Sequence, residues 1–283
     1  MKLYDMQTLM RELTLKELQQ KSLEVLKEIH RFCVENDLKY SLAYGTMIGA
    51  VRHQGFIPWD DDVDIFMPRP DYEKLCNTYK SDRYVLINRG NRDDCMIAFS
   101  RICDARDTCF TTFTPWLRSP EGPGVWVDIF PLDSVSDDPE SFETSYLKLR
   151  KLHHDAVRGR KALRRLSGEK SFSFNLNTLK KKLFSLFWKR PEFYVDEIIS
   201  IAGNIPYGTT GYVAQLAYPG IMARYEISDI ESYHLVRFED EEFYIADGYD
   251  RMLRNVYGDY MQLPPENERV PLQSYIHFYW KEK

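Results

Sequence analysis

Apolar side chains recur at helical spacing between Leu18 and Cys33, which predicts an amphipathic helix near the N-terminus. Just before this pattern, Thr14 and Glu17 have the spacing of a capping box, in which each side chain hydrogen-bonds to the other residue's backbone amide. The polar residue Asn36 follows the last apolar position. The pattern therefore predicts a helix that begins after Thr14 and ends near Asn36.

Further along the chain, short apolar segments alternate with segments of helical periodicity. The predicted strands cover residues 40–44, 63–67, 85–87, 97–102 and 125–130. The predicted helices cover residues 47–52, 70–79, a long basic stretch that begins at Pro139, 191–202 and 250–257. This mixture predicts an α/β or α+β core, a mixed sheet with helices on its faces.

Composition excludes several classes of protein. The 283 residues are 43% hydrophobic and 14% aromatic, enough to form a core, so the chain is not generally disordered. The formal net charge of −5 argues against wholesale nucleic-acid binding. The five cysteines form no Cys-x-x-Cys pair, and the sequence shows neither a signal-peptide pattern nor an apolar run of about 18 residues. We expect a cytoplasmic protein with reduced thiols.

Positive charge is concentrated in one segment. Residues 148–190 contain fourteen Lys and Arg but only Asp155 and Glu169 as acids. Within this segment, Leu and Phe recur at helical spacing over 176–190, so a basic amphipathic helix there could lie on an anionic membrane. Packing on the core, or binding of a phosphate-rich acceptor, is the alternative. His153 and His154 have no matching ligand set and are interpreted as surface or core residues.

The segment Asp60-Asp61-Asp62-Val63-Asp64 carries the strongest chemical signal. Alternate residues of a strand share a face, so Asp62 and Asp64 are predicted to project together. Two neighbouring carboxylates on a buried sheet repel each other unless a cation lies between them, and Mg²⁺ prefers carboxylate oxygens. A solvated acidic turn is the alternative interpretation. Asp60 and Asp61 are left open between metal ligands, supporting residues and turn residues.

Three further features extend this predicted site. Asp128 is a single acid within the apolar strand Trp126-Val127-Asp128-Ile129-Phe130, where it needs a partner that the same metal centre would supply. Gly45 and Thr46 precede a predicted helix, a place where backbone amides and a hydroxyl can hold phosphate. Arg52 and His53 follow that helix and could contact phosphate oxygens. Together with the acids, these residues indicate a phosphoryl-transfer site.

The segment from Gly45 to Asp64 resembles the signature of LicD-type phosphocholine transferases, a family related to fukutin and fukutin-related protein. The resemblance continues through Trp126-Val127-Asp128-Ile129-Phe130-Pro131-Leu132-Asp133 and ends near Tyr257-Gly258-Asp259-Tyr260-Met261-Gln262-Leu263-Pro264-Pro265, so it spans roughly residues 12–270. It implies a nucleotidyltransferase fold of the polymerase-beta type. In one domain over 1–283, residues 12–135 would form the core, 139–190 a basic helical segment, and 191–283 the part that completes the domain.

The resemblance also implies an activity: transfer of phosphocholine from CDP-choline to a hydroxyl of a cell-surface glycan precursor of the lipopolysaccharide, teichoic acid or capsule type. Asp62, Asp64 and Asp128, with Asp60, would bind one or two Mg²⁺ ions, or Mn²⁺, while Gly45, Thr46, Arg52 and His53 hold phosphate. The acceptor could be lipid-linked, which would place the enzyme at the inner face of the cell membrane.

Choline requires aromatic rings, because a quaternary ammonium has no hydrogen to donate. The candidates are Trp59, Tyr44, Trp116 and Trp126. Transfer of another alcohol phosphate, transfer of a nucleotidyl group, and a membrane-docked scaffold with a vestigial fold are the alternative functions.

Overall fold

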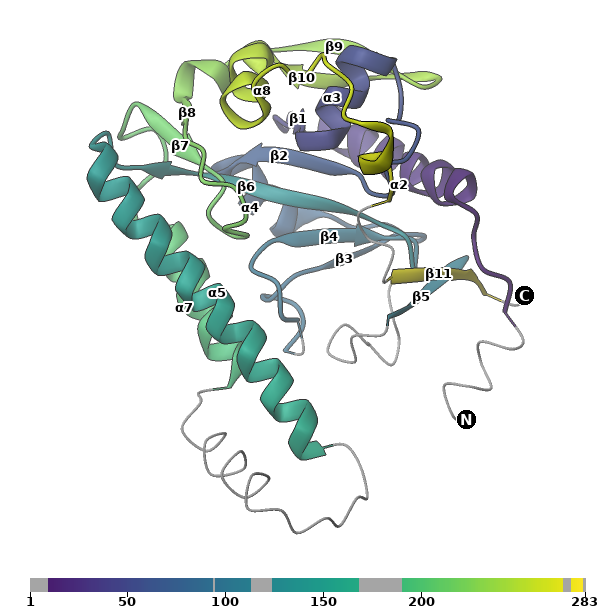
Figure 1. Ribbon diagram of the computed structural model, residues 1–283, viewed down its shortest axis with the longest axis horizontal. Coiled ribbons are helices and arrows are strands. Elements are labelled where there is room, and N and C mark those ends of the chain that lie inside the picture. The colour runs from purple at the N-terminus through teal and green to yellow at the C-terminus, as the bar shows by residue number, and fades with distance from the viewer. Residues whose placement is uncertain (1–9, 94, 113–123, 168–189, 272–275, 282–283) are drawn as a thin grey trace.

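The computed structural model describes residues 10–93, 95–112, 124–167, 190–271 and 276–281, whose elements are shown in Figure 1. The first helix, α2 (Leu15–Glu35), has Thr14 as its N-cap. The Thr14 hydroxyl accepts a hydrogen bond from the Glu17 amide at 3.3 Å, and the Glu17 carboxylate accepts one from the Thr14 amide at 2.9 Å. Asn36 is the C-cap, so the predicted helix and both of its ends are confirmed.

A mixed sheet of seven strands forms the centre of the molecule (Figure 1). Its main path runs β1-β2-β6-β4-β3, and β7 and β8 extend it beyond the far end of the long strand β6. β2 and β6 are parallel, whereas the other neighbours in the sheet are antiparallel. These strands cover Ser41–Leu42 (β1), Asp64–Pro68 (β2), Val85–Ile87 (β3), Ser100–Cys103 (β4), Trp126–Val135 (β6), Tyr212–Ala214 (β7) and Tyr225–Glu226 (β8). The α+β prediction is confirmed.

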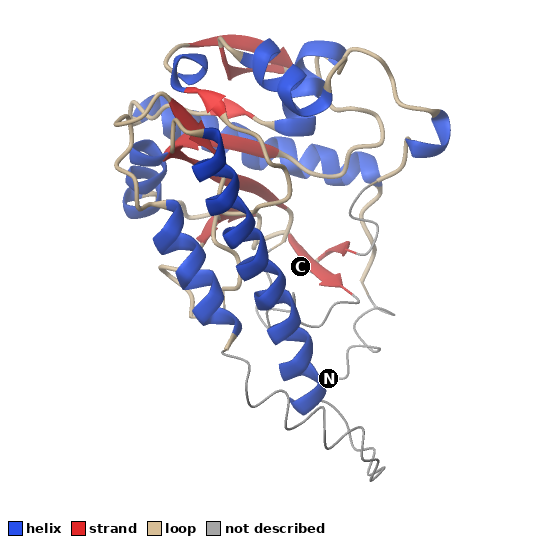
Figure 2. Cartoon of the chain, turned by 60° about the vertical axis from the view of Figure 1, so that its left-hand side comes forward, coloured by secondary structure: helices blue, strands red, loops and turns tan. Residues whose placement is uncertain are grey.

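Helices pack around this sheet, and two of them extend away from it. The shorter ones are α3 (Tyr44–His53), α4 (Arg69–Thr78) and α8 (Tyr249–Tyr257). Helix α5 (Pro139–Ser167) packs along α7 (Pro191–Ala202), and Figure 2 shows this pair projecting from the sheet. Pro139 opens α5 as predicted, but the basic stretch 168–189 lies outside the described residues. None of the helices in the described ranges combines the length and the apolar character needed to cross a bilayer.

Six strands come from segments in which the sequence analysis expected none: β7 and β8 of the main sheet, and the four strands of two separate pairs. β9 (Tyr233–Phe238) and β10 (Glu241–Ala246) form an antiparallel hairpin within the acidic region near residue 240. β5 (Thr108–Thr112) pairs with β11 (Ile276–Trp280) close to the C-terminus. Both pairs are two-stranded, and each strand has only five or six residues, too few to give a clear period in the sequence. Two short 3₁₀ turns, η2 (Ile227–Ile230) and η3 (Glu266–Glu268), complete the elements.

One large core cluster holds α2, α3, the sheet and the β9–β10 hairpin together. Its completely enclosed side chains include Leu26, Ile65, Ile129 and Phe243, which come from widely separated parts of the chain. A second cluster joins α5 and α7 to the end of β6. The two projecting helices are therefore attached to the sheet through apolar packing of their own.

A buried ion pair links the start of α4 to β6. The Arg69 guanidinium donates two hydrogen bonds to the Asp133 carboxylate, with N···O distances of 2.6 and 2.8 Å. The Asp133 side chain is 1% exposed and that of Arg69 14% exposed. A carboxylate so deeply buried is stabilised mainly by its partner, because water cannot solvate it.

We predict that Arg69→Met destabilises the protein by about 3–5 kcal/mol, since it leaves the Asp133 charge buried without its cation. The double variant Arg69→Met/Asp133→Leu should regain most of the loss, because both charges are then replaced by apolar groups. Urea unfolding of the three proteins checks this. A double variant no more stable than Arg69→Met would show that the pair does not act in this way.

Candidate functional site

The parallel pairing of β2 with β6 brings two acids from distant parts of the sequence side by side. Asp64, the first residue of β2, lies opposite Asp128 of β6 in the strand register. Both residues line the same cavity. Asp62 differs from the sequence prediction, because β2 begins only at Asp64 and leaves Asp62 in the preceding loop. It still lines the cavity beside Asp64.

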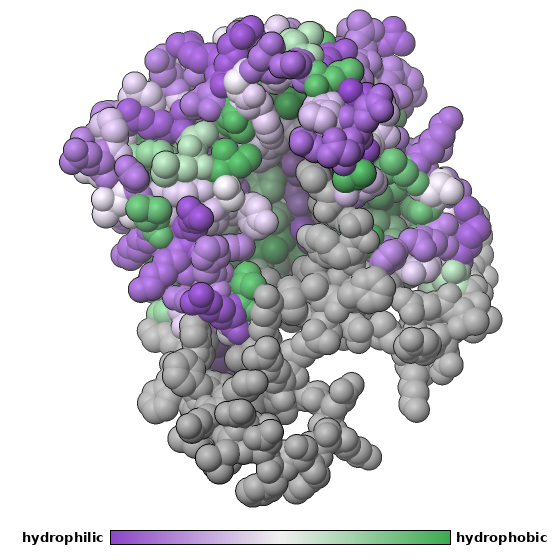
Figure 3. Space-filling model, in the orientation of Figure 1, coloured by the Kyte–Doolittle hydropathy of each residue, from purple (hydrophilic) through white to green (hydrophobic). Residues whose placement is uncertain are grey.

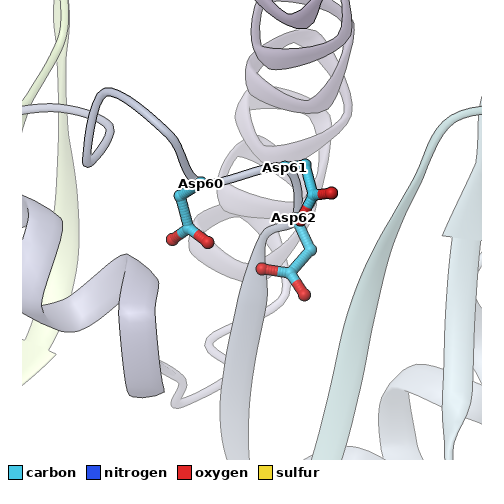
Figure 4. Close-up of side chains that lie close together, drawn as sticks. All are labelled: Asp60, Asp61 and Asp62. Carbon is cyan, nitrogen blue, oxygen red and sulfur yellow. The ribbon is translucent and has the colours of Figure 1, made fainter. Parts of the chain in front are cut away.

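Asp60, Asp61 and Asp62 form a compact cluster in this loop (Figure 4). Each offers a carboxylate oxygen, and these oxygens lie within 4.8 Å of one another. The loop is held from outside, since the Gln19 side chain of α2 donates a 2.9 Å hydrogen bond to the Asp60 carbonyl. Asp60 and Asp61 are each 9% exposed. A solvated acidic turn does not describe this segment, because its carboxylates are largely buried.

The N-terminal end of α3 lies against this cluster. A Cβ atom on Gly45 would lie 2.7 Å from Oδ2 of Asp60, so only glycine leaves space for that carboxylate. The residue before it, Tyr44, has a φ of 45°, a conformation that costs a non-glycine residue free energy and that is concentrated at functional sites. The backbone here is therefore shaped to bring the acidic loop against the helix N-terminus.

Thr46 has a structural contact that the sequence analysis did not foresee. Its side chain is 3% exposed, and its hydroxyl accepts a 3.0 Å hydrogen bond from the Asp64 amide. It is not among the residues that line the cavity. The hydroxyl thus ties the first turn of α3 to the first residue of β2, which fixes Asp64 relative to Gly45. A direct contact of Thr46 with phosphate remains an untested prediction.

Burial, with the nearby negative charges, raises the pKa values of two of the acids. Burial, together with the charges of Asp62 and Asp61, raises the pKa of Asp60 to about 8. Burial also raises the pKa of Asp64 well above its ordinary value, and the charges of Asp62 and Asp128 add to the shift. Carboxyl groups in such surroundings favour a proton or a bound cation.

Asp128 has a partner that the sequence analysis missed. Arg101 of β4 lies opposite Asp128 in the sheet register, and its guanidinium donates two hydrogen bonds to the carboxylate, at 2.5 and 3.2 Å. The guanidinium also lies over the Trp126 ring, 4.2 Å from its centroid. The expectation that a metal centre must supply the partner of Asp128 is therefore wrong, because a neighbouring strand supplies it. The sequence signal for this pair was a single Arg in one apolar strand and a single Asp in another.

The acids occupy one part of a cavity of about 820 Å³. Apolar residues of α5 and α7, such as Ala156, Val157 and Ile198, line another part. The loop 217–221 and residues 257–270 contribute further wall. Figure 3 shows one face of the molecule, and apolar residues, in green, are visible within the hollow in its middle. The cavity thus joins a strongly anionic region to an apolar one.

Two residues predicted to contact phosphate, Arg52 and His53, lie outside the cavity. The Arg52 guanidinium donates hydrogen bonds to the backbone carbonyls of Tyr260 and Gln262, at 2.5 and 3.2 Å. The His53 ring lies edge-on to Trp59, with centroids 6.5 Å apart. Neither Arg52 nor His53 lines the cavity. Their position at the C-terminal end of α3, opposite the end that meets the acids, explains the difference.

Of the four residues predicted to contact choline, two line the cavity and one does not. Trp59 and Tyr44 line the cavity, and Arg269 lies over the Trp59 ring at 5.6 Å. Trp126 is 4% exposed and packs against Phe278 in a core cluster, so it does not reach the cavity. Trp116 lies outside the described residues.

Comparisons with known proteins bear directly on this site. Residues 37–146 match the family model described as the LicD/FKTN/FKRP nucleotidyltransferase domain. Over 266 residues, the chain is 29% identical to the lipopolysaccharide cholinephosphotransferase LicD of Haemophilus influenzae (strain ATCC 51907 / DSM 11121 / KW20 / Rd), an alignment that covers 93% of this chain and 97% of that protein. Residues 37–146 therefore match a LicD-type nucleotidyltransferase domain, and the similarity to LicD extends over most of the chain.

Shorter matches add a local similarity. Uncharacterised proteins of Rickettsia prowazekii (strain Madrid E) and Rickettsia typhi (strain ATCC VR-144 / Wilmington) are each 46% identical to this chain over 48 residues, 17% of its length. These matches cover 18% and 16% of the two Rickettsia proteins.

The LicD domain match divides the cavity into two parts. Residues 37–146 contain α3, β2, β4 and most of the acidic residues of the cavity, together with Arg101. The walls from residue 153 onward, which include those of α7 and the loop 217–221, lie outside the matched range. The LicD domain therefore supplies the charged centre, and later parts of the chain supply the remaining walls.

We predict that the metal-free protein loses stability relative to Asp60→Asn as the pH rises. The pKa of an aspartate in an unfolded chain is about 4, whereas that of Asp60 in the folded protein is raised to about 8. The folded state therefore holds this proton more tightly, and the stability that it contributes below about pH 4 is lost as the pH rises through 8. Urea unfolding in chelator between pH 5 and pH 9 measures the difference.

Asp240→Asn is the matched control, and its stability difference from the wild type should stay constant between pH 5 and pH 9. The side-chain hydrogen bond from Lys27 lowers the pKa of Asp240, so that carboxylate adds stability above its unfolded pKa and loses it only as the pH falls. Parallel pH profiles for the wild type and Asp60→Asn would contradict the burial of a shifted Asp60 carboxyl.

Proposed function

We propose that this protein is a LicD-type phosphotransferase that moves phosphocholine from CDP-choline to a hydroxyl of a cell-surface glycan precursor. The observation that carries the proposal is the convergence of Asp60, Asp62, Asp64 and Asp128 on the α3 N-terminus within a LicD domain. The near full-length alignment with a lipopolysaccharide cholinephosphotransferase supports the choice of transferred group and of a glycan acceptor. Lipopolysaccharide, teichoic acid and capsule precursors are all acceptors of this class.

The donor atoms of the site fit a divalent cation such as Mg²⁺ or Mn²⁺. They are all carboxylate oxygens, and the three residues Asp60, Asp61 and Asp62 place theirs within 4.8 Å of one another. The space that Gly45 leaves free and the raised pKa of Asp60 both agree with a bound cation. In this proposal Asp60, Asp62 and Asp64 hold the cation. When bound, it would neutralise pyrophosphate charge.

The remaining residues orient the reactants. Gly45, at the start of α3, lies against the Asp60 carboxylate, and a helix N-terminus favours the negative charge of a phosphate. Arg101 fixes the orientation of the Asp128 carboxylate through two hydrogen bonds. Asp128 faces the cavity, where its carboxylate can accept the proton of an acceptor hydroxyl.

We predict that the protein, incubated with Mg²⁺, CDP-choline and a glycan acceptor, releases CMP and forms a choline-bearing product. Asp62→Asn and Asp64→Asn should each lower turnover by roughly 100-fold or more, because cation stabilisation of the transferring phosphoryl group is worth several kcal/mol. Asp240→Asn, an exposed acid outside the cavity, is the matched control and should retain wild-type turnover. Chromatography of nucleotide products gives the readout.

Other outcomes of this assay exclude the proposal. Release of phosphocholine, with CMP retained on the acceptor, would indicate a nucleotidyltransferase that leaves its nucleotide on the acceptor. Calorimetry in Mg²⁺ with a panel of CDP-alcohols tests the transferred group. If CDP-ribitol or CDP-glycerol binds as tightly as CDP-choline, choline is not the transferred alcohol. Absence of both Mg²⁺ and nucleotide binding would favour a non-enzymatic role.

We further propose that the enzyme acts at the cytoplasmic face of the membrane, on a lipid-linked acceptor. Exposed cations on α5, including Lys148, Arg150, Lys151 and Arg158, support contact with anionic lipid. We expect the protein to sediment with phosphatidylglycerol vesicles at low salt, and to be released at high salt because charge attraction is screened. Vesicles of phosphatidylcholine alone are the control. No sedimentation with the anionic vesicles at low salt would reject this location.

A further inference from the structure

A continuous series of aromatic rings runs along the wall of the cavity. Successive ring centroids are 5.9 Å apart for Tyr44 and Phe130, 4.6 Å for Phe130 and Phe99, 6.1 Å for Phe99 and Tyr218, and 5.1 Å for Tyr218 and His153. All five residues line the cavity. The series therefore connects the acidic end, at the start of α3, with helix α5.

The far end of this series forms a corner of rings. The Tyr218 ring is inclined at 78° to Phe99 and at 86° to His153. Rings at near right angles present both faces and edges to one space, which is the arrangement that surrounds a quaternary ammonium ion in aromatic cages. The Arg101 guanidinium lies 5.5 Å from the Phe99 centroid, so a ring of this wall already has a cation nearby.

Tyr218 is held in place although it is 49% exposed. The buried Gln215 carboxamide lies 2.8 Å from the Tyr218 carbonyl oxygen and 2.9 Å from its amide nitrogen, so it can donate to the first and accept from the second. The Gly220 amide donates a further 2.7 Å hydrogen bond to the same carbonyl. A fixed, half-exposed aromatic ring at a cavity loses little conformational entropy when a ligand binds.

We propose that the corner formed by Phe99, Tyr218 and His153 binds the trimethylammonium group of the donor, and that Tyr218 determines selectivity for it. This inference rests on the proposed function. A quaternary ammonium cannot donate a hydrogen bond, so aromatic faces are the chemistry that recognises it. The corner and the acids line one cavity, so the proposal places the pyrophosphate of one donor at the acids and its cation at the rings. Trp126, the core residue, takes no part.

The experiment compares charged and neutral donors in calorimetric titrations with Mg²⁺ present. The ligands are CDP-choline and its neutral isostere CDP-3,3-dimethylbutanol, which has the same shape without the charge. Tyr218→Leu keeps apolar area but removes the ring, and Tyr218→Phe keeps the ring. Phe193→Leu is the matched control, because Phe193 is an exposed aromatic residue that does not line the cavity.

We expect Tyr218→Leu to weaken CDP-choline binding roughly 3- to 25-fold, the range of one cation–π contact, and to change binding of the neutral isostere much less. Tyr218→Phe and Phe193→Leu should bind both donors as the wild type does. The preference of the wild type for CDP-choline over the isostere should therefore fall in Tyr218→Leu alone.

Three results would overturn the inference, and they separate it from the proposed function. Equal weakening of both donors by Tyr218→Leu would make the ring an apolar wall without a role in cation recognition. Unchanged donor binding with a raised KM for the glycan would make Tyr218 a platform for the acceptor sugar. In both cases CDP-choline still binds the wild type, and the proposed function stands. If the wild type does not bind CDP-choline, both proposals fail.

Discussion

Mutual repulsion among the carboxylates at the start of β2 is the constraint on which the site depends. Asp60, Asp61 and Asp62 lie in one short loop, and Asp64 follows at the first position of the strand. Two features hold the repelling carboxylates in place. Gly45 leaves space for the Asp60 carboxylate, and the Gln19 side chain of α2 hydrogen-bonds to the loop backbone. An arrangement that costs folding free energy in this way is expected where a cation and phosphate bind.

Asp128 illustrates a different solution to the same problem. It is 6% exposed, and a partly buried arginine, Arg101 of the neighbouring strand, neutralises it, so its orientation does not depend on a bound ion. The same arginine lies over the Trp126 ring, which ties the site to the core cluster that contains Trp126 and Phe278. The centre therefore combines one acid that is oriented in advance with a group of acids whose charges are not balanced within the cluster. This division suits a site that binds a charged donor together with its cation.

The cavity combines contributions of two kinds. The LicD domain match contains the acids and Arg101, whereas α7, the loop 217–221 and most of α5 lie beyond it. The proposed trimethylammonium corner draws on both parts of the chain, because Phe99 lies within the match whereas Tyr218 and His153 lie beyond it.

Local sequence was sufficient for features that depend on neighbours in the chain. Thr14 and Glu17 fixed the start of α2 because a capping box involves only four residues, and the acidic run with its adjoining strand indicated a cation site because like charges cannot be buried unpaired. Tertiary structure decided the rest. The pairing of Arg101 with Asp128, the tie between Thr46 and Asp64, and the meeting of Phe99, Tyr218 and His153 all join residues far apart in sequence. The periodicity of apolar residues predicts which face of a helix or strand is buried. Strand order and packing determine which residues that face contacts.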